Sequence, residues 1–210
     1  MIGIPEAEAG LLERTARSLV SAGASLTGEG RRDLAIASRA AARAHAAGDS
    51  VSEQGEPGEN MPLTGLVNRV TVAPATIRPE WVSSMAQAGV SAPIYVEVLG
   101  LVGRLQAVYT FCFALGQEPV ELPEATDGAP TGRLAPDAAL AGGWVPTVGP
   151  ASPPSVLSSV PDEHEAMHDL HGVFYLSVAE MADLDADRGL HRTQMELVAA
   201  RTSLINECFF

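Results

Sequence analysis

The residues best suited to chemistry lie near the end of the chain, where Glu196 precedes Cys208 by 12 residues. A cysteine reacts as its thiolate, and a carboxylate within reach can take up or return the thiol proton. In one straight helix the two residues would lie about 18 Å apart, at roughly 1.5 Å of rise per residue. A shared site therefore requires the helix to stop near Asn206 and the chain to double back, or Glu196 to meet a neighbouring helix or subunit.

Three histidines form a second candidate group. His164, His168 and His171 are spaced by four and then three residues, which places them on one face of a helix. Imidazole nitrogens bind zinc, and a pair four residues apart can chelate it. A closed site needs further ligands, however, and the HExxH pattern is absent. Carboxylates lie between these histidines, so we favour a solvated helix face and expect no bound metal.

The other cysteine, Cys112, lies between Phe111 and Phe113 in a long apolar stretch. Apolar residues recur there at intervals of three and four, which is typical of a helix packed on a core. Because free cysteine behaves as a small hydrophobic residue, Cys112 is expected inside the protein.

Helices are expected to position all of these residues, because Ala, Leu, Glu and Arg are common and only 5% of the chain is aromatic. Capping and stop residues indicate the helix ends, among them Ser91 as an N-cap and Gly48 and Gly116 as stops. The expected helices cover residues 8–20, 29–47, 79–88, 92–115, 162–184 and 192–206. The predicted fold class is all-α.

Composition divides the chain into four segments. They are an Ala-rich helical extension with an acidic linker or mobile loop (1–60), a helical unit (61–116), a Pro-rich connector (117–161) and a second helical unit (162–210). The connector holds nine of the 15 prolines, which disfavour both helix and central strand. Trp144 is expected to hold this connector against the body, and a plain disordered linker is the alternative.

The two helical units contain a weak internal repeat. Gly89 ends a turn before the helix that carries Glu97, and Gly189 does the same before the helix that carries Glu196. The alignment needs a one-residue gap, so by itself it only suggests duplication. His191 occupies the cap position of the last helix, where weaker capping is expected than from Ser or Thr.

The segment from Arg188 to Phe210 resembles the core motif of the carboxymuconolactone decarboxylase / alkylhydroperoxidase D superfamily. In that family a helix with a Glu leads to an Asn just before a Cys-x-x-Cys, and a His follows four residues after the second Cys. The interval from Glu196 to Cys208 is the one the family uses. The segment 61–116, with Glu97, resembles the family's cysteine-free repeat, and Trp144-Val-Pro-Thr resembles its two-repeat "peroxidase-related" branch.

The resemblance implies an all-α fold of two alkylhydroperoxidase D-like repeats and a thiol-dependent peroxidase that reduces organic hydroperoxides. Glu196 would be the relay carboxylate and Cys208 the resolving cysteine, with no cofactor. A homo-oligomer and a thiol reductant protein are the implied partners. The family's peroxidatic cysteine would fall one residue after Phe210 and its histidine four residues later, so the chain as given is expected to be inactive alone.

Two other functions are compatible with the same residues. One is a non-catalytic helical scaffold or oligomerisation module, and the other is a carboxymuconolactone decarboxylase-like enzyme, which needs no cysteine pair. The apolar ending Phe209-Phe210 leads us to expect a truncated product of a longer gene, with a genuine terminus on a degenerate homologue as the alternative.

Charge excludes several classes of partner. The chain has 26 acidic and 13 basic residues, all of the latter Arg, for a net charge of −13. Such a chain repels nucleic acids and anionic lipids, and the absence of Lys excludes a lysine Schiff base and a P-loop lysine. No apolar run suggests a membrane helix and the N-terminus does not resemble a signal peptide, so a cytoplasmic protein is expected.

Overall fold

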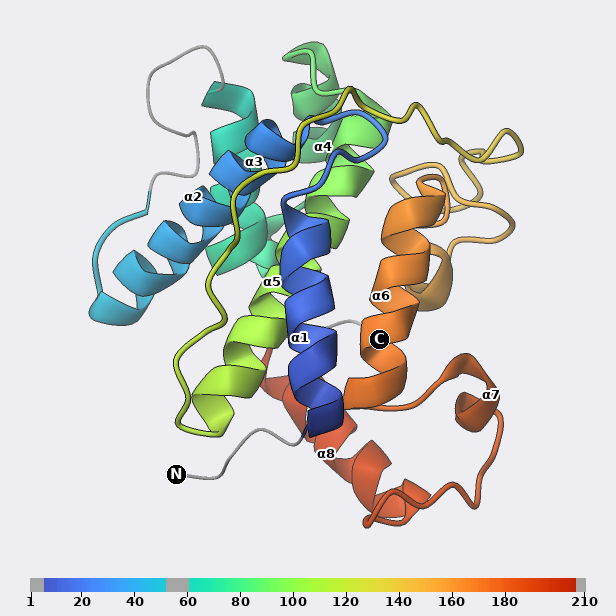
Figure 1. Cartoon of the computed structure of the whole chain (residues 1–210). Coiled ribbons are helices and arrows are strands. Elements are labelled where there is room, and N and C mark those ends of the chain that lie inside the picture. Colours follow the sequence, from blue (N-terminus) through green and yellow to red (C-terminus); the bar gives the residue numbers. More distant parts are fainter. Residues whose placement is uncertain (1–5, 52–60, 207–210) are drawn as a thin grey trace. The chain divides into compact units, whose positions relative to one another are not determined.

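The computed structural model describes residues 6–51 and 61–206, and across them the predicted all-α class is confirmed. The described residues contain helices and two isolated bridges but no strand. The helices are α1 Glu6–Leu19, α2 Gly28–Ala47, α3 Met61–Val72, α4 Pro79–Gln87, α5 Ala92–Ala114, α6 Pro161–Phe174, α7 Val178–Met181 and α8 Arg192–Ile205 (Figure 1). Most of the predicted linker over 49–60 lies outside the described residues.

The chain forms two compact units, Met1–Met167 (unit 1) and His168–Phe210 (unit 2), which divide within α6. The organisation into four segments and two related repeats stays a prediction.

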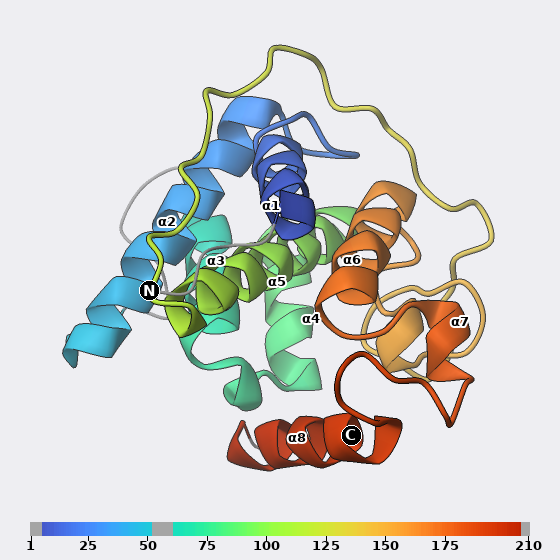
Figure 2. The same cartoon turned by 60° about the horizontal axis from the view of Figure 1, so that its bottom comes forward.

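Helix α5 is the central element of unit 1. It packs against α1, α2 and α3, which lie beside it in Figures 1 and 2. Its buried side chains include Val98, Leu101 and Leu105, and Cys112 is also fully buried, as predicted. By length and composition alone α5 would pass as a membrane-spanning helix, a test that core helices of this kind also pass. It also buries two charged residues, Glu97 and Arg104.

Local signals account for most helix ends. Helix α2 begins after Thr27, whose hydroxyl accepts a hydrogen bond from the Gly30 N–H at 3.1 Å, and it ends at Gly48 in the left-handed region (φ 82°). Only residues that tolerate positive φ end a helix in this way, so the predicted stop is confirmed. Ser91 does occupy the N-cap position of α5, but its side chain makes no capping hydrogen bond.

The proline-rich connector is ordered and contains no α-helix, so the disordered-linker alternative is wrong. Its backbone N–H groups donate to carbonyls of the body, from Thr131 to Gly23 at 2.8 Å and from Ala135 to Ser159 at 3.1 Å. The predicted anchor is also wrong. Trp144 is 52% exposed, whereas its neighbour Val145 is 6% exposed and joins the core.

Unit 2 corrects the single helix predicted over 162–184. Helix α6 ends at Phe174, and a separate turn, α7, begins after Ser177. Ser177 and Glu180 form a capping box, in which the Ser177 N–H donates to Glu180 at 2.8 Å and the Glu180 N–H donates to the Ser177 hydroxyl at 3.3 Å. This reciprocal pair satisfies backbone donors that a continuous helix would have paired internally. The buried side chains of Leu176, Ala186 and Met195 form a small hydrophobic core in unit 2.

The last helix has the predicted limits. His191 is its N-cap, and its ring nitrogen accepts a hydrogen bond from the Thr193 N–H at 3.3 Å, while Gln194 completes a capping box. Asn206 is the C-cap.

Candidate functional site

Glu196, the carboxylate predicted from the sequence, lies in a polar cluster on unit 2. The Tyr175 hydroxyl donates to its Oε1 at 2.6 Å, and Arg192 Nε donates to the same oxygen at 2.6 Å. The Glu196 side chain is 49% exposed. The relay candidate is therefore a half-exposed carboxylate that accepts hydrogen bonds from one phenol and one guanidinium.

These contacts set the charge state of the cluster. The hydrogen bonds from Tyr175 and Arg192 lower the pKa of Glu196. Partial burial, followed by the hydrogen bond to the carboxylate, raises the pKa of Tyr175. At neutral pH the cluster thus contains an ionised carboxylate and a protonated phenol.

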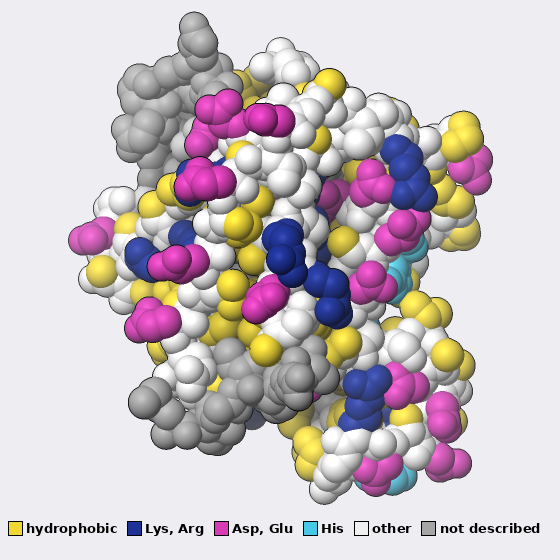
Figure 3. Space-filling model, viewed as in Figure 1, with side chains coloured by type: hydrophobic (Ala, Val, Ile, Leu, Met, Phe, Trp, Pro, Cys, Tyr) yellow, Lys and Arg dark blue, Asp and Glu magenta, His cyan; other side chains and the backbone are white. Residues whose placement is uncertain are grey.

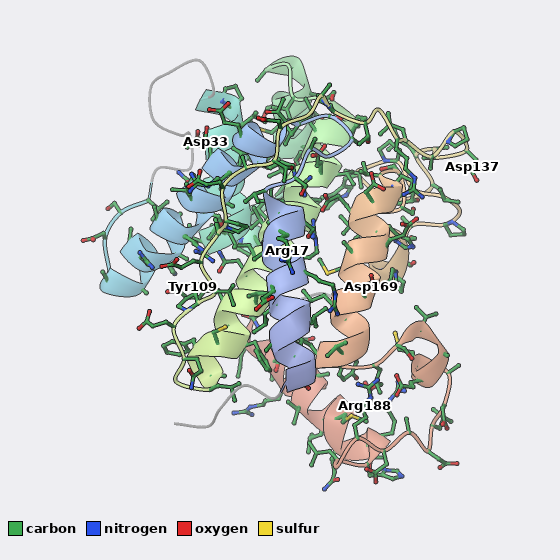
Figure 4. The ribbon with its side chains drawn as sticks, viewed as in Figure 1. Arg17, Asp33, Tyr109, Asp137, Asp169 and Arg188 are labelled. Atoms are coloured by element: carbon green, nitrogen blue, oxygen red, sulfur yellow. The ribbon has the colours of Figure 1, made fainter. Side chains whose placement is uncertain are left out.

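Arginines hold the cluster in place. Arg192 also donates to the carbonyls of Glu180 at 3.1 Å and Met181 at 3.2 Å, which ties α8 to the end of α7. Arg188, labelled in Figure 4 on the segment that leads into α8, forms an ion pair with Glu180 at 2.6 Å. The backbone around Glu196 is therefore fixed from two sides.

Cys208, the predicted thiol, lies outside the described residues. A site shared by Glu196 and Cys208 requires the last helix to end near Asn206. Helix α8 does end there, at Ile205, with Asn206 as its C-cap. The Glu196 carboxylate reaches back to Arg192, one turn toward the start of the helix. The structure thus brings Glu196 together with Tyr175, a residue for which the sequence offered no signal.

The three histidines lie on α6, as their spacing predicted. The His171 ring nitrogen Nδ1 lies 2.8 Å from the Leu176 carbonyl oxygen, and the ring meets Tyr175 edge-on at 5.4 Å between centroids. Glu165, between the histidines, forms an exposed ion pair with Arg133 at 2.7 Å. In the part of the chain that the structure describes, no three His, Cys, Asp or Glu side chains are placed to hold a metal ion.

Sequence reasoning missed a cluster of four charged residues inside unit 1, which we call the buried charge network: Arg31, Glu97, Arg104 and Glu163. Each side chain is at most 3% exposed. Arg31 Nη1 lies 2.6 Å from Glu97 Oε1 and 2.7 Å from Glu163 Oε1. Arg104 Nη2 donates to the other Glu163 oxygen at 2.6 Å. Two positive and two negative groups from α2, α5 and α6 therefore neutralise one another.

Neighbouring groups complete the network. The Ser25 N–H donates to Glu97 Oε2 at 2.8 Å, and Arg104 Nη1 donates to the Ser18 hydroxyl at 2.6 Å. Burial raises the pKa of Glu97, an effect that the adjacent Arg31 opposes. Burial lowers the pKa of Arg31, but the carboxylates of Glu163 and Glu97 offset this and raise it overall. Each of its four side chains forms an ion pair, although the buried Nε atoms of Arg31 and Arg104 have no hydrogen-bond partner among the described residues. Ion pairs that join α2, α5 and α6 suit a role in fixing the helices more than a role in catalysis.

One sequence signal could have revealed this network. Glu97 and Arg104 are seven residues apart in a largely apolar helix, so they lie on the same face. A charge buried on such a face is not solvated by water and needs an oppositely charged partner. Glu97 and Glu196 match in the proposed repeat, and Gly89 (φ 93°) and Gly189 (φ 85°) share the left-handed conformation. The two carboxylates nevertheless differ in environment, one fully buried and one half-exposed.

Comparison with known proteins finds no family model, no curated protein and no solved structure that matches the chain.

Proposed function

We propose that the chain is the helical body of an alkylhydroperoxidase-like thiol system that reduces organic hydroperoxides. In this proposal Glu196 and Tyr175 form the proton relay, and Cys208 is the resolving thiol. The observation that carries it is the Glu196 carboxylate, which accepts a hydrogen bond from the Tyr175 hydroxyl at 2.6 Å and remains half-exposed. The sequence resemblance around Cys208 supplies the reaction class.

The chemistry consists of two balanced steps. A peroxidatic thiolate attacks a peroxide oxygen, the O–O bond breaks, and the alkoxide takes a proton to leave as an alcohol, with a sulfenic acid left on the protein. The Cys208 thiolate then attacks the sulfenic sulfur, the S–O bond breaks as the disulfide forms, and the departing hydroxide takes a proton to leave as water. The two thiols supply both electrons, and a thiol reductant restores them. The relay pair would accept the thiol proton and return one to the departing oxygen.

This scheme requires a peroxidatic thiol in addition to Cys208, and residues 1–210 contain one other cysteine, Cys112. Cys112 is unsuited to the role because it is fully buried in the core of unit 1. The chain on its own is therefore inactive in this scheme. Reduced thiols of this type suit the cytoplasm, which we propose as the location.

The relay also needs a second copy of the chain. Glu196 lies ten residues before Asn206, about 15 Å along the axis at roughly 1.5 Å per residue, and its carboxylate is held toward Arg192. The carboxylate is thus directed toward the start of α8. A homo-oligomer would let the relay of one subunit meet the thiol of another.

A second candidate is a non-catalytic helical scaffold that associates through α8. The observation that favours it is the exposure of large apolar side chains on this helix, among them Leu197 and Leu204, each 72% exposed and seven residues apart. In this reading Glu196 merely forms a surface ion pair.

One experiment separates the two candidates. The chain is compared with an extended chain that carries a cysteine directly after Phe210 and a histidine four residues later. We expect no thiol-dependent consumption of cumene hydroperoxide by the chain as given and measurable consumption by the extended chain. Glu196→Gln in the extended chain should lower the rate by about 100-fold or more, the usual contribution of a positioned acid–base group.

The matched control is Glu80→Gln, an exposed carboxylate on α4. It should leave the rate of the extended chain unchanged. A folded extended chain that stays inert would overturn the peroxidase proposal and favour the scaffold, as would a rate that is insensitive to Cys208→Ser.

A further inference from the structure

An apolar cavity of about 370 Å³ lies in unit 1. Its lining residues fall between Pro79 and Pro146, so they do not include the relay residues Tyr175 and Glu196. Its walls come from α4, the start of α5 and the connector loop 140–146. The lining is formed mainly by apolar side chains, including Val82, Ala86, Val90, Leu140, Trp144 and Pro146. A volume of this size is within the range of cavities that bind small molecules.

The connector wall of this cavity is built rigidly. Ala139 and Thr147 form an antiparallel bridge, with N–H to carbonyl distances of 3.0 and 2.9 Å, which closes the loop between them. The Val148 N–H donates to the Ser158 hydroxyl at 2.8 Å directly after the bridge. Val145 is buried in the core, while Trp144 leaves half of its surface uncovered. The loop therefore presents an indole to the cavity at a fixed place.

One phenol lies in the wall of the cavity. Tyr95 lines it, and only 5% of the residue is exposed. Its ring is fixed edge-on against Trp81, with 6.3 Å between centroids. Burial raises the pKa of Tyr95 to about 12, so at neutral pH the hydroxyl stays protonated and can donate a hydrogen bond. A hydroxyl in the wall of the cavity can donate a hydrogen bond to a molecule bound there.

Charge limits the class of ligand. Among the residues that the structure describes, no charged side chain lines the cavity, and an ion brought there would lose hydration without compensation. We infer that the cavity binds a small, uncharged, largely apolar organic molecule that stacks on Trp144 and has one acceptor group, to which the Tyr95 hydroxyl donates a hydrogen bond. This inference is independent of the proposed peroxidase function.

The test uses two uncharged probes of nearly the same shape, 2-acetylnaphthalene, which has a carbonyl acceptor, and 2-ethylnaphthalene, which has none. Binding is followed by calorimetry and by the emission of Trp144 in a Trp81→Phe background. We expect saturable binding of both probes at one site per chain, with a change in Trp144 emission. Tyr95→Phe should weaken the ketone about three- to tenfold, the range for one hydrogen bond, and leave the hydrocarbon unchanged.

Two adjacent substitutions on α4 localise the site. Ala86→Phe places a ring in the cavity and should weaken both probes at least tenfold. Gln87→Phe adds the same ring to the same helix at an exposed position that does not line the cavity, and it should change binding by less than twofold. Equal effects of the two substitutions, or a lack of saturable binding of either probe to the wild-type chain, would overturn the inference. Both variants are checked for wild-type helicity by circular dichroism.

Discussion

Arg31 and Glu97, 66 residues apart in the sequence, form an ion pair of 2.6 Å in which neither side chain is more than 2% exposed. The same guanidinium nitrogen also holds Glu163 at 2.7 Å. One side chain on α2 thus neutralises carboxylates on both α5 and α6. Acidic side chains are otherwise spread over the surface, as on the face in Figure 3.

Replacement of Arg31 should destabilise the protein strongly. Arg31→Leu leaves two buried carboxylates without their shared partner, so the free energy of unfolding should fall by about 3–5 kcal/mol. Urea denaturation at pH 7 measures this. The control Arg133→Leu removes an arginine whose partners Asp162 and Glu165 are on the surface, and it should change the midpoint little. Similar losses for the two variants would contradict a structural role for the buried charge network.

Gly100 should not tolerate a methyl group. A Cβ there would lie 2.4 Å from Glu163 Oε2 and 2.9 Å from Glu163 Cβ, so the carboxylate would have to leave its place between Arg31 and Arg104. We expect Gly100→Ala to cost about 1–3 kcal/mol despite the better helix propensity of alanine. Gly103→Ala, on the same helix, meets only the flexible end of Met167 at 3.1 Å. It should be neutral or slightly stabilising, and thermal unfolding of the two variants compares them directly.

The Glu180 carboxyl should titrate far below the ordinary range. Hydrogen bonds from Arg188 and Ser177 lower its pKa to about 2. Because the folded pKa lies below the unfolded value, the interaction stabilises the fold above the unfolded pKa of 4.5, and this stabilisation is lost as the pH falls toward 2. NMR titration of the side-chain carboxyl should give a midpoint near 2, and Arg188→Ala should raise it toward 4.5. An unchanged midpoint in the variant would argue against the Arg188 contact.

Cys112 should be unreactive in the folded protein. It is fully buried on α5 and faces the core of unit 1. In the Cys208→Ser variant, the single remaining thiol should react with Ellman's reagent only at the rate of protein opening and at once in denaturant. Rapid reaction of the native variant would show that the α5 core opens easily.

Much of the local structure could be predicted from the sequence. Helix α2 ends at Gly48 and α8 ends at Asn206 because helix signals act within one or two turns, through caps, stop residues and apolar periodicity. The break between α6 and α7 was missed although it is also local, because the Ser177–Glu180 capping box lies inside a stretch that favours helix throughout.

The sequence by itself determined the helical class, most helix ends and the burial of Cys112. Only the tertiary structure decided which polar groups meet: Arg31 with Glu97 and Glu163, and Tyr175 with Glu196. It also decided that Val145, and not Trp144, anchors the connector. The physical reason is that helix propensity and capping depend on near neighbours in the chain. The partner of a charge depends instead on which helices exclude water from it, and the packing of residues far apart in the sequence sets that exclusion.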